Sequence, residues 1–205
     1  MEQLRATRRA GRELEEVRPD TRTAILDATE RLLAETPLHE LTVAEIMEAA
    51  EVSRGTFYSY FSSKFEAAAA LLERTMSEAF DVMRAAIDGV DGPPTLEELR
   101  NYLVGSTRLW QEHRAVLRAS HENWHAVPEL REQWLAAVER FTDALARVLS
   151  SNGDPSPQLR RRVASALWAT ERLEYIADSG VDRDVRGGDE LIDTLMEYWA
   201  PLLRA

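Results

Sequence analysis

Hydrophobic residues recur every three to four positions along almost the whole 205-residue chain, which is the spacing of amphipathic α-helices. No stretch alternates hydrophobic and polar residues as a half-buried strand does. The pattern therefore predicts an all-α fold. Together with the capping residues and prolines, it predicts helices over about 21–36, 42–50, 54–61, 64–86, 95–112, 114–127, 128–150, 157–180 and 189–205.

The segment 41–64, LTVAEIMEAAEVSRGTFYSYFSSK, predicts two short helices joined by a tight turn. Thr42 and Glu45 have the spacing of a capping box at the start of the first helix. Ser53 closes the turn at 51–53 and is placed to cap the second helix. A helix, a short turn and a second helix form a helix-turn-helix unit, whose second helix enters the major groove of DNA.

The second helix, residues 54–61, has side chains suited to DNA on its outer face. Val52, Phe57 and Phe61 have the spacing of core residues that face inward. The outer face and its flanks then carry Arg54, Gly55, Thr56, Tyr58 and Tyr60. Arginine can donate two hydrogen bonds to guanine, and a glycine lets the nucleic acid approach closely. The alternative is a solvated amphipathic helix that carries tyrosines and binds no DNA.

The segment LTVAEIMEAAEVSRGTFYSYFSSKFE resembles the signature of the TetR family of bacterial transcriptional regulators. It combines that family's Thr cap, A-x-V turn, G-T-x-Y core and F-x-S-K exit. The resemblance implies a three-helix DNA-binding domain followed by a helical domain that binds a ligand and dimerises. It also implies operator contacts from Thr42, Val43, Ala44, Ser53, Arg54, Gly55, Thr56, Tyr58, Tyr60 and Lys64.

Glu51 departs from the family pattern, because the turn usually has glycine at this position. If the backbone there is left-handed, a residue other than glycine costs on the order of 1 kcal/mol. A carboxylate close to DNA is also unfavourable. We therefore expect Glu51 to lower the affinity for DNA.

Composition narrows the class of protein. The formal net charge of −11 argues against broad, non-specific binding of nucleic acid, but it is compatible with a local basic patch. The lack of cysteine excludes disulfides and thiolate metal sites. No apolar run approaches the roughly 20 residues of a membrane span, and the N-terminus has no apolar signal segment. We expect a cytoplasmic protein with no cofactor and no membrane partner.

The sequence predicts three parts. Residues 1–19 carry four arginines ahead of three glutamates and form the expected flexible basic arm. Such an arm is either a frayed charged tail or a segment that reaches a minor groove or phosphates. Residues 20–65 form the expected DNA-binding domain, and residues 66–205 the expected effector-binding and dimerisation domain.

Aromatic residues gather in the second domain, where all five tryptophans follow residue 100. Each one alone fits an ordinary core, but as a set they predict an apolar pocket between helices. RPDTRTAILDATERLLAETPLHELTVAEI, EHRAVLRA and ATERL resemble the actinobacterial ethionamide-resistance repressor (EthR-like) subfamily, which implies a long apolar tunnel. Pattern and resemblance together predict ligand-binding residues Tyr102, Trp110, Trp134, Val138, Phe141, Leu167, Thr170 and Tyr175. That subfamily has ligand-anchoring amides where this chain has Leu167 and Thr170, so its ligand chemistry is not carried over.

The last two helices, 157–180 and 189–205, have surfaces for a partner. The final helix is apolar on two faces, and the helix before it offers small residues that permit close approach. These faces fit either an ordinary core or a dimer interface. The resemblance favours a dimer, because TetR-like proteins pair through these helices as a four-helix bundle with two-fold symmetry. The predicted dimerisation residues are Ala166, Leu173, Leu195, Trp199 and Leu202.

Two short motifs indicate other chemistry. His121, Glu122 and His125 form an HExxH string, which on a helix can hold zinc beside a general base. Pro128 shortens this segment and no third ligand is evident, which favours a polar helix end. The GGDE string at 187–190 is similar to the core of diguanylate cyclases, but a loop that ends in an Asp189 helix cap explains it.

The sequence thus predicts a DNA-binding transcriptional regulator that is not an enzyme. We expect a repressor that binds a palindromic operator as a homodimer and is released by a small apolar ligand. One alternative is a metal-dependent hydrolase that uses the HENWH segment. The other is a helical adaptor whose helix-turn-helix, marked by Glu51, no longer binds DNA.

Overall fold

The computed structural model describes residues 20–87, 93–150 and 153–204. Within these ranges the chain forms nine α-helices and a final 3-10 helix and contains no β-strand, which confirms the all-α prediction. The arm predicted over 1–19 lies outside the described residues, as do parts of both long loops. No helix in the described ranges is both long enough and apolar enough to cross a bilayer.

The helix boundaries agree closely with the predicted ranges. In chain order they are α2 Thr21–Leu33, α3 Val43–Ala49, α4 Arg54–Tyr60, α5 Lys64–Ile87, α6 Leu96–Glu112, α7 Arg114–Asn123, α8 Pro128–Leu149, α9 Pro157–Ser179, α10 Asp189–Trp199 and η1 Ala200–Arg204.

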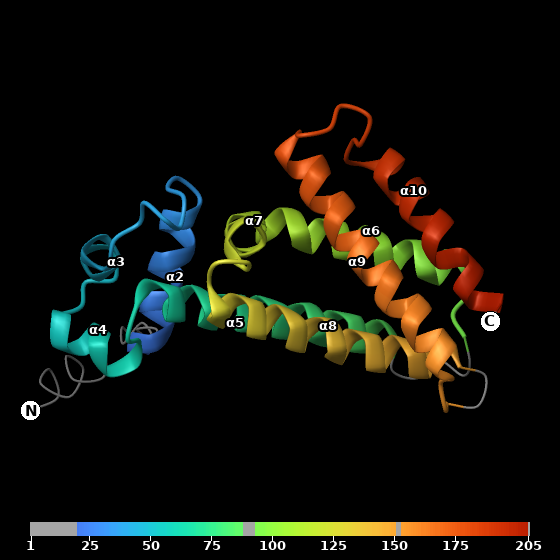
Figure 1. Ribbon diagram of the computed structural model, residues 1–205, viewed down its shortest axis with the longest axis horizontal. Helices are drawn as coiled ribbons and strands as arrows, with labels where there is room; N and C mark the ends of the chain where they lie inside the picture. The colour runs from blue at the N-terminus through green and yellow to red at the C-terminus, as the bar shows by residue number, and fades with distance from the viewer. Residues whose placement is uncertain (1–19, 88–92, 151–152, 205) are drawn as a thin grey trace, which may run out of the picture.

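The helices form two groups that α5 joins (Figure 1). Helices α2, α3 and α4 lie at one end of the molecule, and α6, α9 and α10 lie toward the other. Helices α5 and α8 run side by side and make the most extensive helix pairing in the described chain. The short helix α7 packs on α2 and α5, so it connects the two groups a second time.

Local sequence explains where the first helices begin. Thr42 Oγ1 accepts a hydrogen bond from the Glu45 backbone N–H at 3.3 Å, and Glu45 Oε2 accepts from the Thr42 N–H at 2.7 Å. Ser53 Oγ accepts from the Thr56 N–H at 3.1 Å. These bonds satisfy N–H groups that have no partner inside the helix. Both predicted caps are therefore confirmed.

Several predicted helix ends were wrong: α7 stops at Asn123 rather than at 127, and α10 stops at Trp199 and is followed by η1. Helix α2 stops at Leu33 rather than near Pro37, because proline has no N–H to bond the carbonyl four residues earlier, here that of Leu33, and its ring clashes with that carbonyl. At the start of α10, Gly188 occupies the capping position with φ 74° and Asp189 is the first helical residue, without a capping bond. The carboxylate of Asp189 still lies in the first turn, where it interacts favourably with the helix dipole.

A Schellman motif ends α3 and sets the geometry of the turn. The Val52 N–H bonds to the Met47 carbonyl at 3.0 Å, and the Glu51 N–H bonds to the Glu48 carbonyl at 3.2 Å. This motif needs a left-handed residue just past the helix, usually glycine. Glu51 fills that place with φ 55°, and it is the one non-glycine residue with positive φ in the described ranges. The strain expected at Glu51 is therefore present.

The hydrophobic core is continuous from the helix-turn-helix into the second half of the chain. Ile46, Phe57 and Phe61 of the first half lie in the same buried cluster as Trp110 and Trp134. A second cluster, built around α6, α8, α9 and α10, fills the far end. There the indole N–H of Trp199 donates to Thr170 Oγ1 at 2.8 Å, which ties α10 to α9.

Replacement of Glu51 by glycine should stabilise the protein. The left-handed backbone costs a side chain about 1–2 kcal/mol, whereas the extra freedom of glycine in the unfolded chain costs about 0.5–1 kcal/mol. We expect Glu51→Gly to raise the free energy of unfolding by about 0.5–1 kcal/mol in urea denaturation.

Glu48→Gly is the matched control, because Glu48 is also exposed but lies within α3. It should lower the free energy of unfolding by about 1 kcal/mol. Equal losses from both substitutions would show that the φ of Glu51 carries no strain.

Candidate DNA-binding face and ligand cavity

The outer face of α4 is exposed and carries aromatic and cationic side chains. Tyr58 and Tyr60 are each 44% exposed, although large hydrophobic rings are normally covered. The Arg54 guanidinium lies 5.2 Å from the centre of the Tyr58 ring. On the opposite face, Phe57 is fully buried and anchors α4 to the core. The helix therefore presents a formed surface on a fixed support.

The remaining residues expected at DNA lie around this surface. A Cβ built on Gly55 meets nothing nearer than Ser53 Oγ at 3.9 Å, so packing within the protein does not require glycine there. Ala44 is exposed at the start of α3, and Val43 is half-buried beside it. The hydroxyls of Ser53 and Thr56 share a hydrogen bond of 2.7 Å at the start of α4.

Lys64 has a structural role that sequence reasoning missed. Its ammonium donates to the backbone carbonyls of His39 at 2.9 Å and Leu41 at 2.6 Å. The first residue of α5 thereby holds the loop that leads into α3. The expected phosphate contact of Lys64 stays a prediction.

A cavity of about 350 Å³ lies between α5, α6, α8 and α9. That volume is within the range of small-molecule sites. Seven of the eight predicted ligand residues line it: Tyr102, Trp110, Trp134, Val138, Phe141, Leu167 and Thr170. The eighth, Tyr175, instead stacks on His121 with the two ring centres 4.0 Å apart.

Sequence reasoning missed two parts of the cavity wall. One is the apolar face of α5, which contributes Met76, Ala79, Val82 and Met83. The other is a pair of carboxylates on α9, Glu171 and Glu174. A usable signal was present, because two acids three residues apart share one face of a helix and follow the predicted Leu167 and Thr170 along it.

The two carboxylates have different surroundings. His121 Nδ1 lies in direct contact with Glu171 Oε1. Glu174 is only 4% exposed and accepts long hydrogen bonds from Thr107 Oγ1 at 3.3 Å and Ser106 Oγ at 3.5 Å. Burial raises the pKa of the Glu174 carboxyl to about 8; the two hydroxyls oppose this rise, and the negative charge of Glu171 adds to it.

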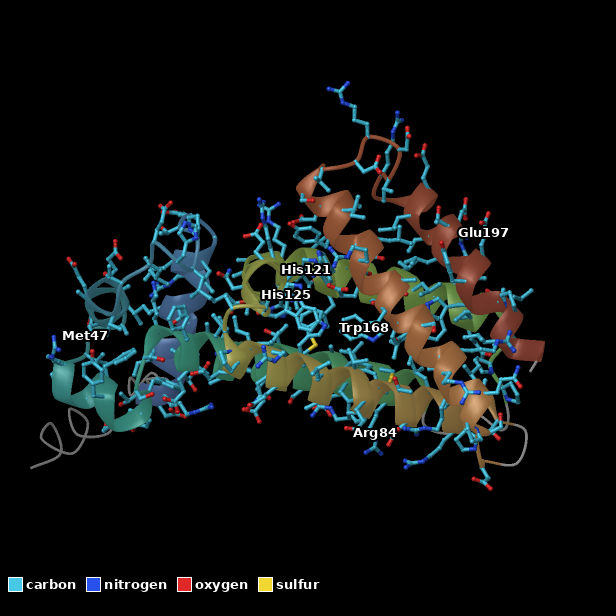
Figure 2. All side chains as sticks on the ribbon, in the orientation of Figure 1. Met47, Arg84, His121, His125, Trp168 and Glu197 are labelled. Carbon is cyan, nitrogen blue, oxygen red and sulfur yellow. The ribbon has the colours of Figure 1, made fainter. Side chains whose placement is uncertain are left out.

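The HENWH segment lies at the end of α7, where Figure 2 labels His121 and His125. His121 is buried against Glu171 and Tyr175, while Glu122 forms an ion pair with Arg118 at 2.9 Å. In the described ranges, no group of three His, Asp or Glu residues could hold a metal ion. His125, unlike His121, is exposed.

Most of the predicted dimerisation residues are core residues of one chain. Four are buried within the protein: Ala166, Leu195, Trp199 and Leu202. The expectation that they meet a partner conflicts with this burial, because α10 and η1 pack against α6 and α9 of the same chain. Only Leu173 is partly exposed. The same face of α9 carries Ala169 and Ile176, which are also partly exposed.

Comparisons with known proteins agree with this architecture. Residues 25–73 match a family model described as "Bacterial regulatory proteins, tetR family". The regulator EthR of Mycobacterium tuberculosis is 26% identical over 188 residues, which cover 88% of this chain and 85% of EthR. The regulator TtgR of Pseudomonas putida is 29% identical over 171 residues, which cover 77% of this chain and 80% of TtgR.

Solved structures show the same fold at lower identity. A tetR-family regulator from Streptomyces coelicolor superposes with a TM-score of 0.70 and 19% identity, over 89% of this chain and 80% of its own. The fatty acid degradation regulator FadR of Bacillus halodurans gives a TM-score of 0.66 and 17% identity, over 91% and 96%.

Stability should depend on pH through Glu174. Between pH 4.5 and pH 8 the folded chain holds a proton that the unfolded chain releases, so the free energy of unfolding falls as pH rises and then levels. Each pKa unit is worth about 1.4 kcal/mol, so the fall amounts to a few kcal/mol. Urea denaturation at pH 5, 6.5 and 8 measures it.

Glu174→Gln should remove this fall, because a neutral amide replaces the titrating group. Glu197→Gln is the control, since Glu197 is exposed on α10 (Figure 2). Parallel pH profiles for Glu174→Gln and the unmodified protein would contradict the assignment.

Proposed function

We propose that this chain, a regulator of the tetR family related to EthR, is a repressor that binds an inverted-repeat operator as a homodimer and leaves it when a small ligand fills the cavity. The observation that carries the proposal is the exposed face of α4, where Arg54, Tyr58 and Tyr60 project from a helix fixed by buried Phe57. Such a face is suited to base and phosphate contacts in a major groove. KstR of Mycobacterium tuberculosis, which is 25% identical over 83% of this chain, is a transcriptional repressor.

Helix α5 supports the coupling of ligand to DNA. It begins at Lys64 beside α4 and lines the cavity farther along with Met76 and Met83. Between these points, Arg74 pairs with Asp27 at 2.6 Å and with Glu30 at 2.9 Å, both on α2. A ligand that moves α5 thereby moves the support of the helix-turn-helix.

A second connection runs from α6. His113, between α6 and α7, bonds through Nδ1 to Glu30 at 2.9 Å and lies 3.4 Å through Nε2 from Glu78 of α5. Trp110 of the cavity wall is three residues before it. A ligand releases DNA through these links only if it binds the released conformation better than the DNA-bound one.

The homodimer is supported by apolar surface left uncovered on α9 and α10. Leu173 and Ile176 of α9, Met196 of α10 and Leu203 of η1 are partly exposed, and α9 packs directly on α10. Two copies related by a two-fold axis would bury this surface as a bundle of four helices. Their recognition helices would then meet two half-sites of an inverted repeat.

Selection from DNA tests the regulatory function. The purified protein, incubated with random and genomic fragments at moderate salt, should retain a short inverted repeat. Tyr58→Ala should abolish the enrichment. If the unmodified protein enriches no DNA sequence, the result would favour the helical adaptor that does not bind DNA over the repressor.

Arg54→Ala should weaken binding to the selected operator by about 1–3 kcal/mol and relax specificity at one base pair. The control is Arg108→Ala, which removes the same charge from an exposed position on α6. Fluorescence anisotropy on the operator and on single-base variants measures both effects. Equal weakening on every sequence would make Arg54 a phosphate contact.

Ile176→Glu should separate the dimer, because a carboxylate would be buried at the interface without a partner. We expect the dissociation constant of the dimer to rise about 30-fold or more. Light scattering after gel filtration should then give the chain mass of 23.2 kDa instead of twice that value. Leu135→Glu on α8, where Leu135 is 46% exposed, should leave the dimer intact. A dimeric Ile176→Glu protein would place the interface elsewhere.

A further inference from the structure

The charge of the cavity wall is one-sided. Its lining residues include three acids, Glu98, Glu171 and Glu174, and no lysine, arginine or histidine. Most of the remaining wall is apolar or aromatic. Charges inside such a low-dielectric space interact strongly, so the cavity favours a ligand with positive charge.

Glu174 is the acid that lacks a counter-charge. Glu171 is contacted by His121, and Glu98 forms the capping box of α6 with Thr95. Glu174 receives only the two long hydroxyl bonds from α6, and in the described ranges no cationic side chain forms an ion pair with it. A buried carboxylate that has only two long hydroxyl bonds and no cation is costly to ionise, so it either holds a proton or needs a cation beside it.

Aromatic rings surround the space in front of these carboxylates. Trp110, Trp134 and Phe141 line the cavity, and Tyr102 lines it beside Glu174. Aromatic faces attract cations and also cover an apolar body. One molecule that carries both features would use the carboxylate and the rings together.

We propose that the cavity binds an amphiphilic amine, whose ammonium group donates hydrogen bonds to Glu174 while its apolar body lies among the aromatic rings. This proposal rests on the proposed function only because it takes this cavity as the effector site. The effector it describes is a cation with an apolar body, whereas the sequence analysis expected a purely apolar ligand.

A matched series of probes tests the charge. The three compounds are 4-phenylbutylamine, 4-phenylbutanol and 4-phenylbutyrate, which share one apolar body and differ in the charge at its end. Titration calorimetry and quenching of tryptophan fluorescence on the full chain measure binding. We expect the amine to bind at least about tenfold more tightly than the alcohol, and the carboxylate to bind most weakly.

Glu174→Gln should abolish the preference for the amine over the alcohol. Glu197→Gln, at an exposed site on α10, is the control for a lost surface charge. Glu174→Asp keeps the charge and withdraws it by one methylene, so it should retain part of the preference. Circular dichroism of each variant establishes that the fold is intact.

Proton release gives a second readout. Since the pKa of Glu174 is near 8, binding of the ammonium at pH 7 should release close to one proton, whereas the alcohol should release none. Calorimetry in buffers of different ionisation enthalpy measures this number. The other ionisable groups facing this region are Glu98 and Tyr102 of α6, His121 of α7 and Glu171 of α9. Any proton release that the Glu174→Gln variant still shows comes from these groups.

Three results would overturn the assignment: equal affinity for amine and alcohol, an amine affinity that Glu174→Gln leaves unchanged, or no binding of the amine at millimolar concentration. Retention of operator DNA is measured on the same preparation. A chain that binds the amine through Glu174 but retains no DNA would keep this assignment and overturn the repressor. A chain that binds DNA but prefers the alcohol would keep the repressor and overturn this assignment.

Discussion

The close packing of α5 against α2 and α8 is the interaction on which the rest of the structure depends. Alanines 67–69 and the neighbouring Leu71 and Leu72 are buried, and their small or regular side chains let the adjacent helices approach. The same helix begins beside α4 and lines the cavity farther along. Because close-packed interiors transmit small displacements, a shift of α5 reaches both functional surfaces.

Polar contacts define how that packing couples the two halves. Arg74 of α5 holds two acids of α2, and His113 joins one of them, Glu30, to the end of α6. These side chains are only partly buried, so each pair contributes little to stability by itself. These contacts matter because they join α2, α5 and α6 between the candidate DNA-binding face and the cavity.

The cavity combines two tendencies that compete in an ordinary core. Aromatic and methionine side chains favour a dry, apolar ligand, whereas Glu174 disfavours an empty or purely apolar space once it is ionised. The protein tolerates the acid because it can stay protonated near neutral pH. A buried carboxyl group that is protonated near neutral pH can lose its proton when a cation enters the cavity. The proposed chemistry of the ligand therefore follows from the acid more than from the rings.

The sequence alone determined the helices, the helix-turn-helix and its caps at Thr42 and Ser53, because these follow from hydrophobic spacing and hydrogen bonds within a few residues. It also pointed to seven residues of the cavity wall and to strain at Glu51, which backbone geometry then located in a Schellman motif. Only the tertiary structure decided which apolar residues of α10 are covered within the chain and which stay partly exposed, since periodicity cannot tell a core from an interface. It alone also showed that Lys64 holds the loop before α3, that His121 contacts Glu171, and that only two hydroxyls reach Glu174, because these contacts join segments distant in sequence.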